Sequence, residues 1–171
     1  AAGALSGYDT IMDTNARMMS DEQWTWLGTQ LEKPAKLRII VSSLQFSASY
    51  NGGEAWNVLP LEQQRMINLI KTKRANGVLF ISGDVHFGDL NVIKPTDCYP
   101  LYDLTSSGLT HREEKPYKST NRVPGVGAPL NNLNFGQIDI DWDNQNITML
   151  VNNNKAVAKI KKTIPFADLN F

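Results

Sequence analysis

The stretch Val78-Leu79-Phe80-Ile81-Ser82-Gly83-Asp84-Val85-His86-Phe87 decides how this sequence is interpreted. Its first four residues are apolar and two of them are β-branched, which favours a strand buried on both faces in the middle of a parallel sheet. The run ends at Ser82-Gly83, and the polar residues Asp84 and His86 follow at once. Ligands of open α/β sheets bind beyond the carboxyl ends of the strands, so we expect both side chains at such an end.

Asp84 and His86 are two residues apart, so an extended backbone would point their side chains the same way. A carboxylate oxygen and an imidazole nitrogen together suit a hard or borderline metal ion. The alternative is a surface loop with a capping Asp and an incidental His, in a chain that has 2 His in all. We predict that Asp84 and His86 are ligands of one metal site.

Composition sets the outer bounds of the interpretation. A chain of 171 residues predicts one domain with its own core. Lys+Arg and Asp+Glu are both 17, which offers no basic field for nucleic acid or an acidic membrane. The single Cys98 excludes an internal disulfide and a Cys-rich zinc site. No apolar run approaches a membrane span, and the opening Ala1-Ala2-Gly3-Ala4 without Met is typical of a processed or truncated end.

The first half of the chain has the pattern of a parallel crossover. Ser20-Asp21-Glu22-Gln23 is a capping box that predicts a helix ended by Pro34. An apolar strand at residues 37–41 is followed by a long connection with Asn51-Gly52-Gly53-Glu54, then by a helix that begins at Pro60. Strand, helix and strand in this order place residues 42–45 and 82–86 at the same edge of the sheet.

In the second half of the chain the spacing of apolar residues changes. We expect an irregular excursion up to Cys98, and then a strand that leads into Thr105 and to His111, the other His of the chain. Residues 112–133 have the composition of a surface loop. From Asn134 onward apolar and polar residues alternate between turns, which predicts an antiparallel meander with one buried face. The fold class is therefore α/β, a parallel crossover followed by a carboxyl-terminal antiparallel meander.

Six motifs now occur in a fixed order along most of the chain. They are Gln23-Trp24-Thr25-Trp26-Leu27, Ser42-Ser43-Leu44-Gln45, Glu54-Ala55-Trp56, Ser82-Gly83-Asp84-Val85-His86-Phe87, Tyr99-Pro100-Leu101-Tyr102 and Thr105-Ser106-Ser107-Gly108-Leu109-Thr110-His111.

Together these motifs resemble the carboxyl-terminal half of a PhoD-like alkaline phosphatase/phosphodiesterase. The resemblance implies a calcineurin-like metallophosphoesterase fold, an αββα sandwich. Residues 1–171 would then be a single domain or the carboxyl-terminal half of such a domain. It also implies metal-dependent hydrolysis of phosphate mono- or diesters, with Fe, Ca, Mn or Zn as the metal.

The resemblance suggests roles for three further residues. His111 is the candidate for orienting phosphate or protonating the leaving group; the alternative is a buried His hydrogen-bonded to backbone. Gln45 could line the site through its amide or satisfy the sheet edge. Asp13-Thr14-Asn15 departs from the family's Asp-Thr-Arg element, and Arg17 is the candidate that binds phosphate from a shifted position.

The departures from the family pattern define the partner that we expect. No counterpart of the family's metal-binding amino-terminal half is present, so we expect that half as a companion chain or neighbouring subunit, and no turnover from the isolated chain. The alternative is a non-catalytic structural or interaction subunit that keeps the phosphatase scaffold. By family resemblance, the expected location is extracellular, periplasmic or an organellar lumen.

Overall fold

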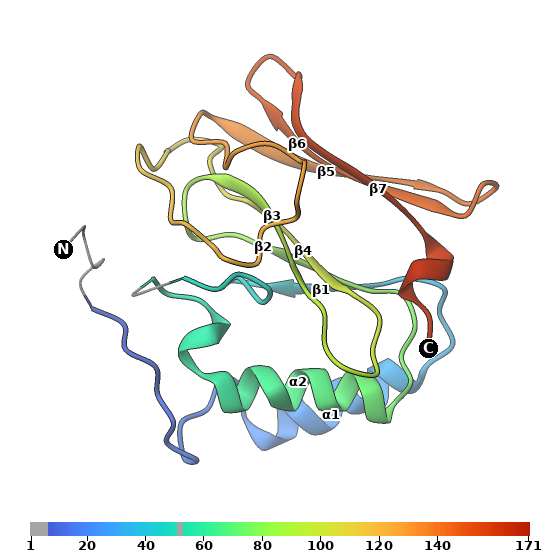
Figure 1. Ribbon diagram of the computed structural model, residues 1–171. Coiled ribbons are helices and arrows are strands. Elements are labelled where there is room, and N and C mark those ends of the chain that lie inside the picture. The colour runs from blue at the N-terminus through green and yellow to red at the C-terminus, as the bar shows by residue number, and fades with distance from the viewer. Residues whose placement is uncertain (1–6, 51–52) are drawn as a thin grey trace.

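The computed structural model describes residues 7–50 and 53–171, which form a mixed α/β fold with two sheets (Figure 1). The expected processed end at Ala1–Ala4 and the Asn51-Gly52 part of the long connection lie outside the described residues. The elements are α1 (Asp21–Glu32), β1 (Arg38–Ser42), the 3₁₀ helix η1 (Trp56–Val58), α2 (Pro60–Thr72), β2 (Val78–Ser82), β3 (Gly88–Ile93), β4 (Leu101–Ser106), β5 (Asn134–Asp141), β6 (Asn146–Asn153), β7 (Ala158–Pro165) and the 3₁₀ helix η2 (Phe166–Leu169).

The four-stranded sheet has the order β1-β2-β4-β3. β2 pairs in parallel with β1 and with β4, so the apolar run of the opening stretch forms an internal parallel strand, as predicted. β3 is antiparallel to β4 and occupies the segment that was expected to be irregular. That expectation was wrong because β3 buries polar side chains along with apolar ones: Asp89 and Asn91 are fully inaccessible to solvent.

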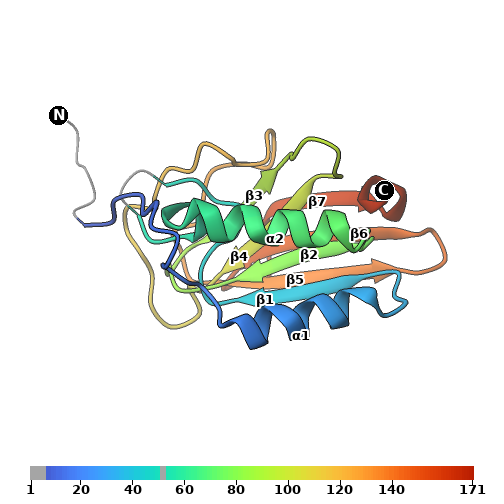
Figure 2. The ribbon, with the colours of Figure 1, turned by 90° about the horizontal axis from the view of Figure 1, so that it is seen from below.

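The two helices cover one face of this sheet (Figures 1 and 2). α1 begins at the predicted capping box: Ser20 accepts a hydrogen bond from the Gln23 backbone N–H, and the Gln23 side chain accepts one from the Ser20 backbone N–H. Trp24 of α1 is buried and donates its indole N–H to Glu62 of α2 at 3.2 Å. The helices are therefore joined through a buried polar contact as well as through apolar packing.

The three-stranded sheet lies over the opposite face of the four-stranded sheet (Figure 1). Its strands are antiparallel and follow one another in the order β5-β6-β7. Ile147, Met149 and Val151 of β6 alternate along the strand and are fully buried between the sheets. The described residues thus form three layers: a helical layer, a four-stranded sheet and a three-stranded sheet.

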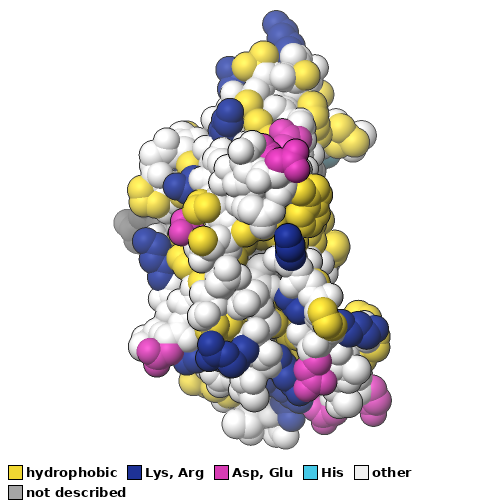
Figure 3. Space-filling view, turned by 90° about the vertical axis from the view of Figure 1, so that its right-hand side faces the viewer, with side chains coloured by type: hydrophobic (Ala, Val, Ile, Leu, Met, Phe, Trp, Pro, Cys, Tyr) yellow, Lys and Arg dark blue, Asp and Glu magenta, His cyan; other side chains and the backbone are white. Residues whose placement is uncertain are grey.

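β1 and β5 are edge strands of their two sheets and run along the same side of the molecule (Figure 2). Between the sheets lies an open cleft of about 820 Å³, lined by apolar residues that include Val41, Ile81 and Ile138. Figure 3 shows hydrophobic side chains in a hollow between the upper and lower parts of the molecule. Val41 is 75% exposed and Ile39 is 41% exposed. β1 is therefore less buried than its apolar sequence predicts, because no described element covers this face.

Among the described residues, no helix combines the length and apolar character needed to cross a membrane.

Candidate metal centre

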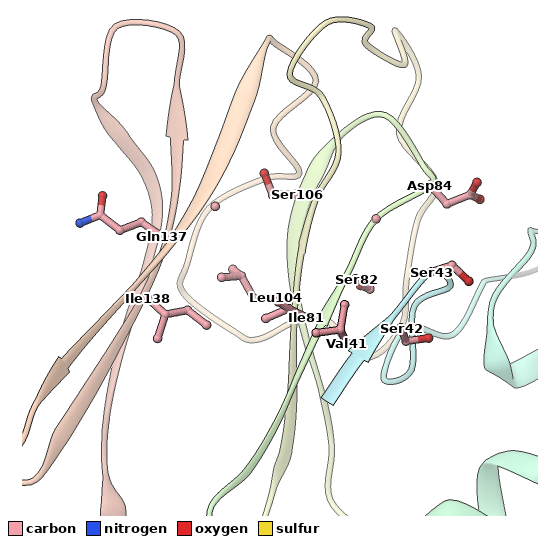
Figure 4. A pocket seen from close by; sticks show the side chains of 12 residues that line it. Val41, Ser42, Ser43, Ile81, Ser82, Asp84, Leu104, Ser106, Gln137 and Ile138 are labelled. Carbon is pink, nitrogen blue, oxygen red and sulfur yellow. The ribbon is translucent and has the colours of Figure 1, made fainter. Parts of the chain in front are cut away.

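The carboxyl ends of β1 and β2 meet at one edge of the sheet, as predicted. Ser42 and Ser82 are register partners, and the Gly83 backbone N–H donates to the Ser43 carbonyl at 3.3 Å. The Gln45 amide donates to the Gly83 carbonyl. Figure 4 shows Asp84 at the end of the cleft, with its carboxylate directed away from the apolar residues that line it. The loop that follows β2 is thus attached to the loop that follows β1.

Asp84 and His86 lie in the left-handed backbone region, with φ of 69° and 58°. The extended conformation expected between them was wrong. The cause lies in their neighbours: Val85 and Phe87 are buried in a small apolar cluster, 7% and 0% exposed. Burying these two side chains leaves Asp84 and His86 exposed. A left-handed conformation costs a non-glycine residue on the order of 1 kcal/mol, and such strain gathers at functional sites.

The two histidines of the chain contact each other. The His86 and His111 rings pack edge to face with centroids 4.7 Å apart. The His86 backbone N–H donates to Ser107 Oγ at 2.8 Å, and the His86 carbonyl accepts from the Glu113 N–H at 2.9 Å. His111 is exposed, so the alternative of a buried, backbone-bonded His111 was wrong.

The Tyr8 hydroxyl is influenced by two carboxylates, Glu54 and Asp84. The pKa of Tyr8 is raised because its hydroxyl is hydrogen-bonded to Glu54, with smaller contributions from the negative charges of Glu54 and Asp84. Sequence reasoning did not assign a role to either Tyr8 or Glu54. The signal for Glu54 was its place in the Glu54-Ala55-Trp56 motif, whereas nothing in the sequence around Tyr8 points to this edge.

The family model described as PhoD-like phosphatase matches residues 4–153. The chain belongs to the PhoD-like phosphatase family. Alkaline phosphatase D of Bacillus subtilis (strain 168) is 29% identical over 87 residues, which cover 46% of this chain and 15% of that protein. A solved structure described as "Structure of PhoD" superposes with a TM-score of 0.58 at 17% identity, over 77% of this chain and 28% of the other. The chain thus corresponds to less than a third of either relative.

These matches confirm the family predicted from the six motifs. The structural likeness also confirms the coarse fold, a mixed α/β arrangement with parallel and antiparallel sheets.

Gln45 and Arg17 were the two candidate substrate-binding residues in this PhoD-like chain. Gln45 is fully buried and uses its amide N–H on the Gly83 carbonyl, which holds the loop that precedes Asp84. Arg17 is exposed, and its guanidinium donates to the carbonyls of Thr14 and Ala16 in its own loop. The described contacts of Arg17 are therefore local and do not bring it to Asp84.

Asp103 is a buried carboxyl group beneath these loops. Its Oδ2 accepts the backbone N–H groups of Phe46 at 2.7 Å and Ser47 at 3.0 Å, and its Oδ1 accepts the Ser82 hydroxyl at 2.7 Å. Burial raises the pKa of Asp103 to about 6. One carboxyl group thus connects the end of β2 and the loop after β1 to β4.

The donor set is suitable for a metal but is incomplete within the described ranges. Asp84 and His86 offer a carboxylate oxygen and an imidazole nitrogen at an exposed edge, which suits Fe, Ca, Mn or Zn in part. Over residues 7–50 and 53–171, no group of three or more His, Cys, Asp or Glu side chains is arranged to hold a metal ion. Further ligands would have to come from outside this arrangement.

Proposed function

We propose that this chain carries the carboxyl-terminal part of the active site of a metal-dependent phosphoesterase that acts on phosphate mono- or diesters. The observation that carries the proposal is the strained pair Asp84 and His86 at the end of β2, with His111 packed on His86. Most other left-handed, non-glycine residues, such as Asp97 and Gln145, lie in connections between elements that have no such cluster. Membership of the PhoD-like phosphatase family supports the same chemistry.

In this proposal Asp84 and His86 hold the metal. A bound metal ion polarises the phosphoryl oxygens and lowers the pKa of a bound water. The Asp84 carboxylate adds negative charge that retains the cation, and His86 binds through a neutral ring nitrogen. Either nitrogen of the exposed His111 ring can donate a hydrogen bond when protonated, so His111 orients the phosphoryl group or protonates the leaving alcohol.

We also propose that an amino-terminal half, as a companion chain or a neighbouring subunit, completes both the site and the fold. Three observations support this half: the cleft of about 820 Å³, the outer edges of β1 and β5, which no described strand pairs with, and the exposed Val41. The matched solved chain is also far longer, since this chain covers 28% of it. The added half would complete the αββα sandwich. The family resemblance leads us to propose an extracellular, periplasmic or luminal location.

The test of the metal site is a Mn²⁺ titration followed by electron paramagnetic resonance. Asp84→Asn and His86→Asn keep a residue that tolerates the left-handed backbone and should each weaken Mn²⁺ binding by about tenfold or more. Asp97→Asn is the matched control, since Asp97 is also exposed with φ of 56° but lies in the β3–β4 connection. Equal affinity in wild type and Asp84→Asn would refute the assignment. No metal binding even with the companion half would favour a non-catalytic scaffold.

A further inference from the structure

Asn134 is the first residue of β5 and connects the three-stranded sheet to the turn after β4. Its side chain is buried, and its Oδ1 accepts the Ser106 hydroxyl at 2.8 Å and the Gly108 backbone N–H at 3.4 Å. Its Nδ2 donates to the Asn132 carbonyl at 2.8 Å, and its own backbone N–H donates to the Gly108 carbonyl at 2.9 Å. Asn134 therefore bonds both the backbone N–H and the backbone carbonyl of Gly108.

The turn that Asn134 holds is also the support of His86. Ser107 lies between the two residues that Asn134 contacts, and its Oγ accepts the His86 backbone N–H at 2.8 Å. The Ser107 backbone N–H donates to the Phe87 carbonyl at 3.3 Å. A displacement of this turn would therefore move the partner of the His86 backbone, and it would also move the chain that leads to His111.

The packing of Gly108 against Asn134 leaves no space for a side chain at position 108. A Cβ atom added to Gly108 would lie 2.1 Å from Asn134 Nδ2 and 3.0 Å from its Cγ. Real Cβ atoms do not approach heavy atoms so closely, so any side chain at position 108 would displace Asn134. The glycine and the asparagine therefore function as one structural unit, although 26 positions separate them in the sequence.

We propose that Asn134 is a positioning residue of the metal site: through the turn at residues 106–108 it fixes the backbone of His86 and the contact between His86 and His111. The proposal rests on the proposed function only for its consequence, metal binding. Its structural content, control of His86 by Asn134, can be tested without a metal. Asn134 has no role as a ligand in this proposal, because its side-chain atoms are used within the protein.

Amide hydrogen exchange provides the first test. In Asn134→Ala, the amides of His86 and Glu113, neither of which bonds to Asn134, should exchange about tenfold faster than in wild type. The amides in the middle of β6 should be unchanged. Asn152→Ala is the matched control, because Asn152 is a buried asparagine of the same sheet whose amide bonds Gln137 instead. Equal acceleration at His86 in both variants, or none in Asn134→Ala, would overturn the proposal.

A double-mutant cycle separates the Asn134–Gly108 unit from general loosening. Gly108→Ala should accelerate exchange at His86 about as much as Asn134→Ala does, because the added methyl group displaces Asn134. In the double variant, the His86 amide should exchange no faster than in Asn134→Ala alone, since an alanine at position 134 leaves room for the methyl group. If the two tenfold accelerations instead multiply to about a hundredfold in the double variant, the two residues act independently and the coupling is refuted.

Mn²⁺ affinity distinguishes failure of this proposal from failure of the proposed function. Asn134→Ala should weaken Mn²⁺ binding by about tenfold, as expected for a residue that orients a ligand, whereas Asn152→Ala should not. Wild type that has no Mn²⁺ affinity even with the companion half supplied would refute the proposed function, and the exchange data would still decide whether Asn134 controls His86. If wild type binds Mn²⁺ and Asn134→Ala binds it equally well, the positioning role is refuted.

Discussion

Asp103 is the buried group whose replacement tests the structure beneath the site most sharply. It is fully buried and accepts two backbone N–H groups, from Phe46 and Ser47, and the hydroxyl of Ser82. Asp103→Asn keeps an oxygen acceptor for both N–H groups and gains an amide that can donate to Ser82. Asp103→Ala leaves the two N–H groups unpaired at roughly 1–3 kcal/mol each. The alanine variant should therefore be less stable than the asparagine variant by about 4 kcal/mol.

The pH dependence has a defined sign. Burial raises the pKa of Asp103 from 3.8 to about 6, so between these values the folded state holds a proton that the unfolded state has released. The stability contributed by Asp103 is therefore present below about pH 4 and is lost as the pH rises through about 6. The loss is on the order of 3 kcal/mol, from about two pH units at 1.36 kcal/mol each. Asp103→Asn does not titrate and should not show this loss.

Urea unfolding of wild type, Asp103→Asn and Asp103→Ala measures both the loss of the hydrogen bonds and the pH dependence. The measurements are made at about pH 4.0 and about pH 7.0, roughly the two ends of the Asp103 titration. The stability of Asp103→Asn relative to wild type should rise by about 2 kcal/mol between the two conditions, since part of the full effect is already lost at about pH 4.0. Other groups titrate equally in both proteins, so their contributions cancel in this difference. A difference that stays flat or falls with pH would refute the assignment of the raised pKa to Asp103. An alanine variant as stable as the asparagine variant would refute the hydrogen-bond accounting.

Three further predictions concern the scaffold. Ser20→Ala removes the acceptor for the Gln23 N–H and should lower the free energy of unfolding by about 1 kcal/mol in urea; no change would contradict the capping role. Gly77→Ala should cost more than about 2 kcal/mol, because Gly77 has φ of +70° and its Cβ would lie 2.1 Å from the Lys36 carbonyl oxygen. Val41→Lys should change stability by less than about 0.5 kcal/mol, since Val41 is 75% exposed, yet should reduce self-association measured by light scattering; strong destabilisation would show a buried Val41.

The sequence predicts the strand that buries only apolar side chains at its start, β2, and misses the strand that also buries charged and polar side chains, β3. β2 was predicted because its four leading residues are apolar. β3 was missed because Asp89 is buried against Arg122 at 2.7 Å, a partner 33 residues away that no local period reveals. A buried charge needs a partner, and the partner is supplied by tertiary contacts that the local sequence does not show. The polar residues of the β3 segment were therefore interpreted as part of a loop.

The candidate site divides in the same way. The position of Asp84 and His86 at the end of β2 followed from the order of strands, which is a local signal. Their left-handed conformation did not, because it depends on the burial of Val85 and Phe87 against the loop after β1. Glu54 acts on the same Tyr8 hydroxyl as Asp84, and it lies in a connection whose path no pattern in the sequence specifies.

The central claim is that Asp84 and His86 form part of a phosphoesterase site that an amino-terminal half completes. The most direct measurement is hydrolysis of a chromogenic phosphodiester with added manganese, calcium, iron or zinc. It is made on the chain alone and with the amino-terminal half of the family fold supplied as a separate polypeptide. We expect no turnover from the chain alone, turnover from the pair, and loss of this turnover in a pair that carries Asp84→Asn. Turnover by a monodisperse monomer of this chain alone, or full activity of the Asp84→Asn pair, would contradict the central claim.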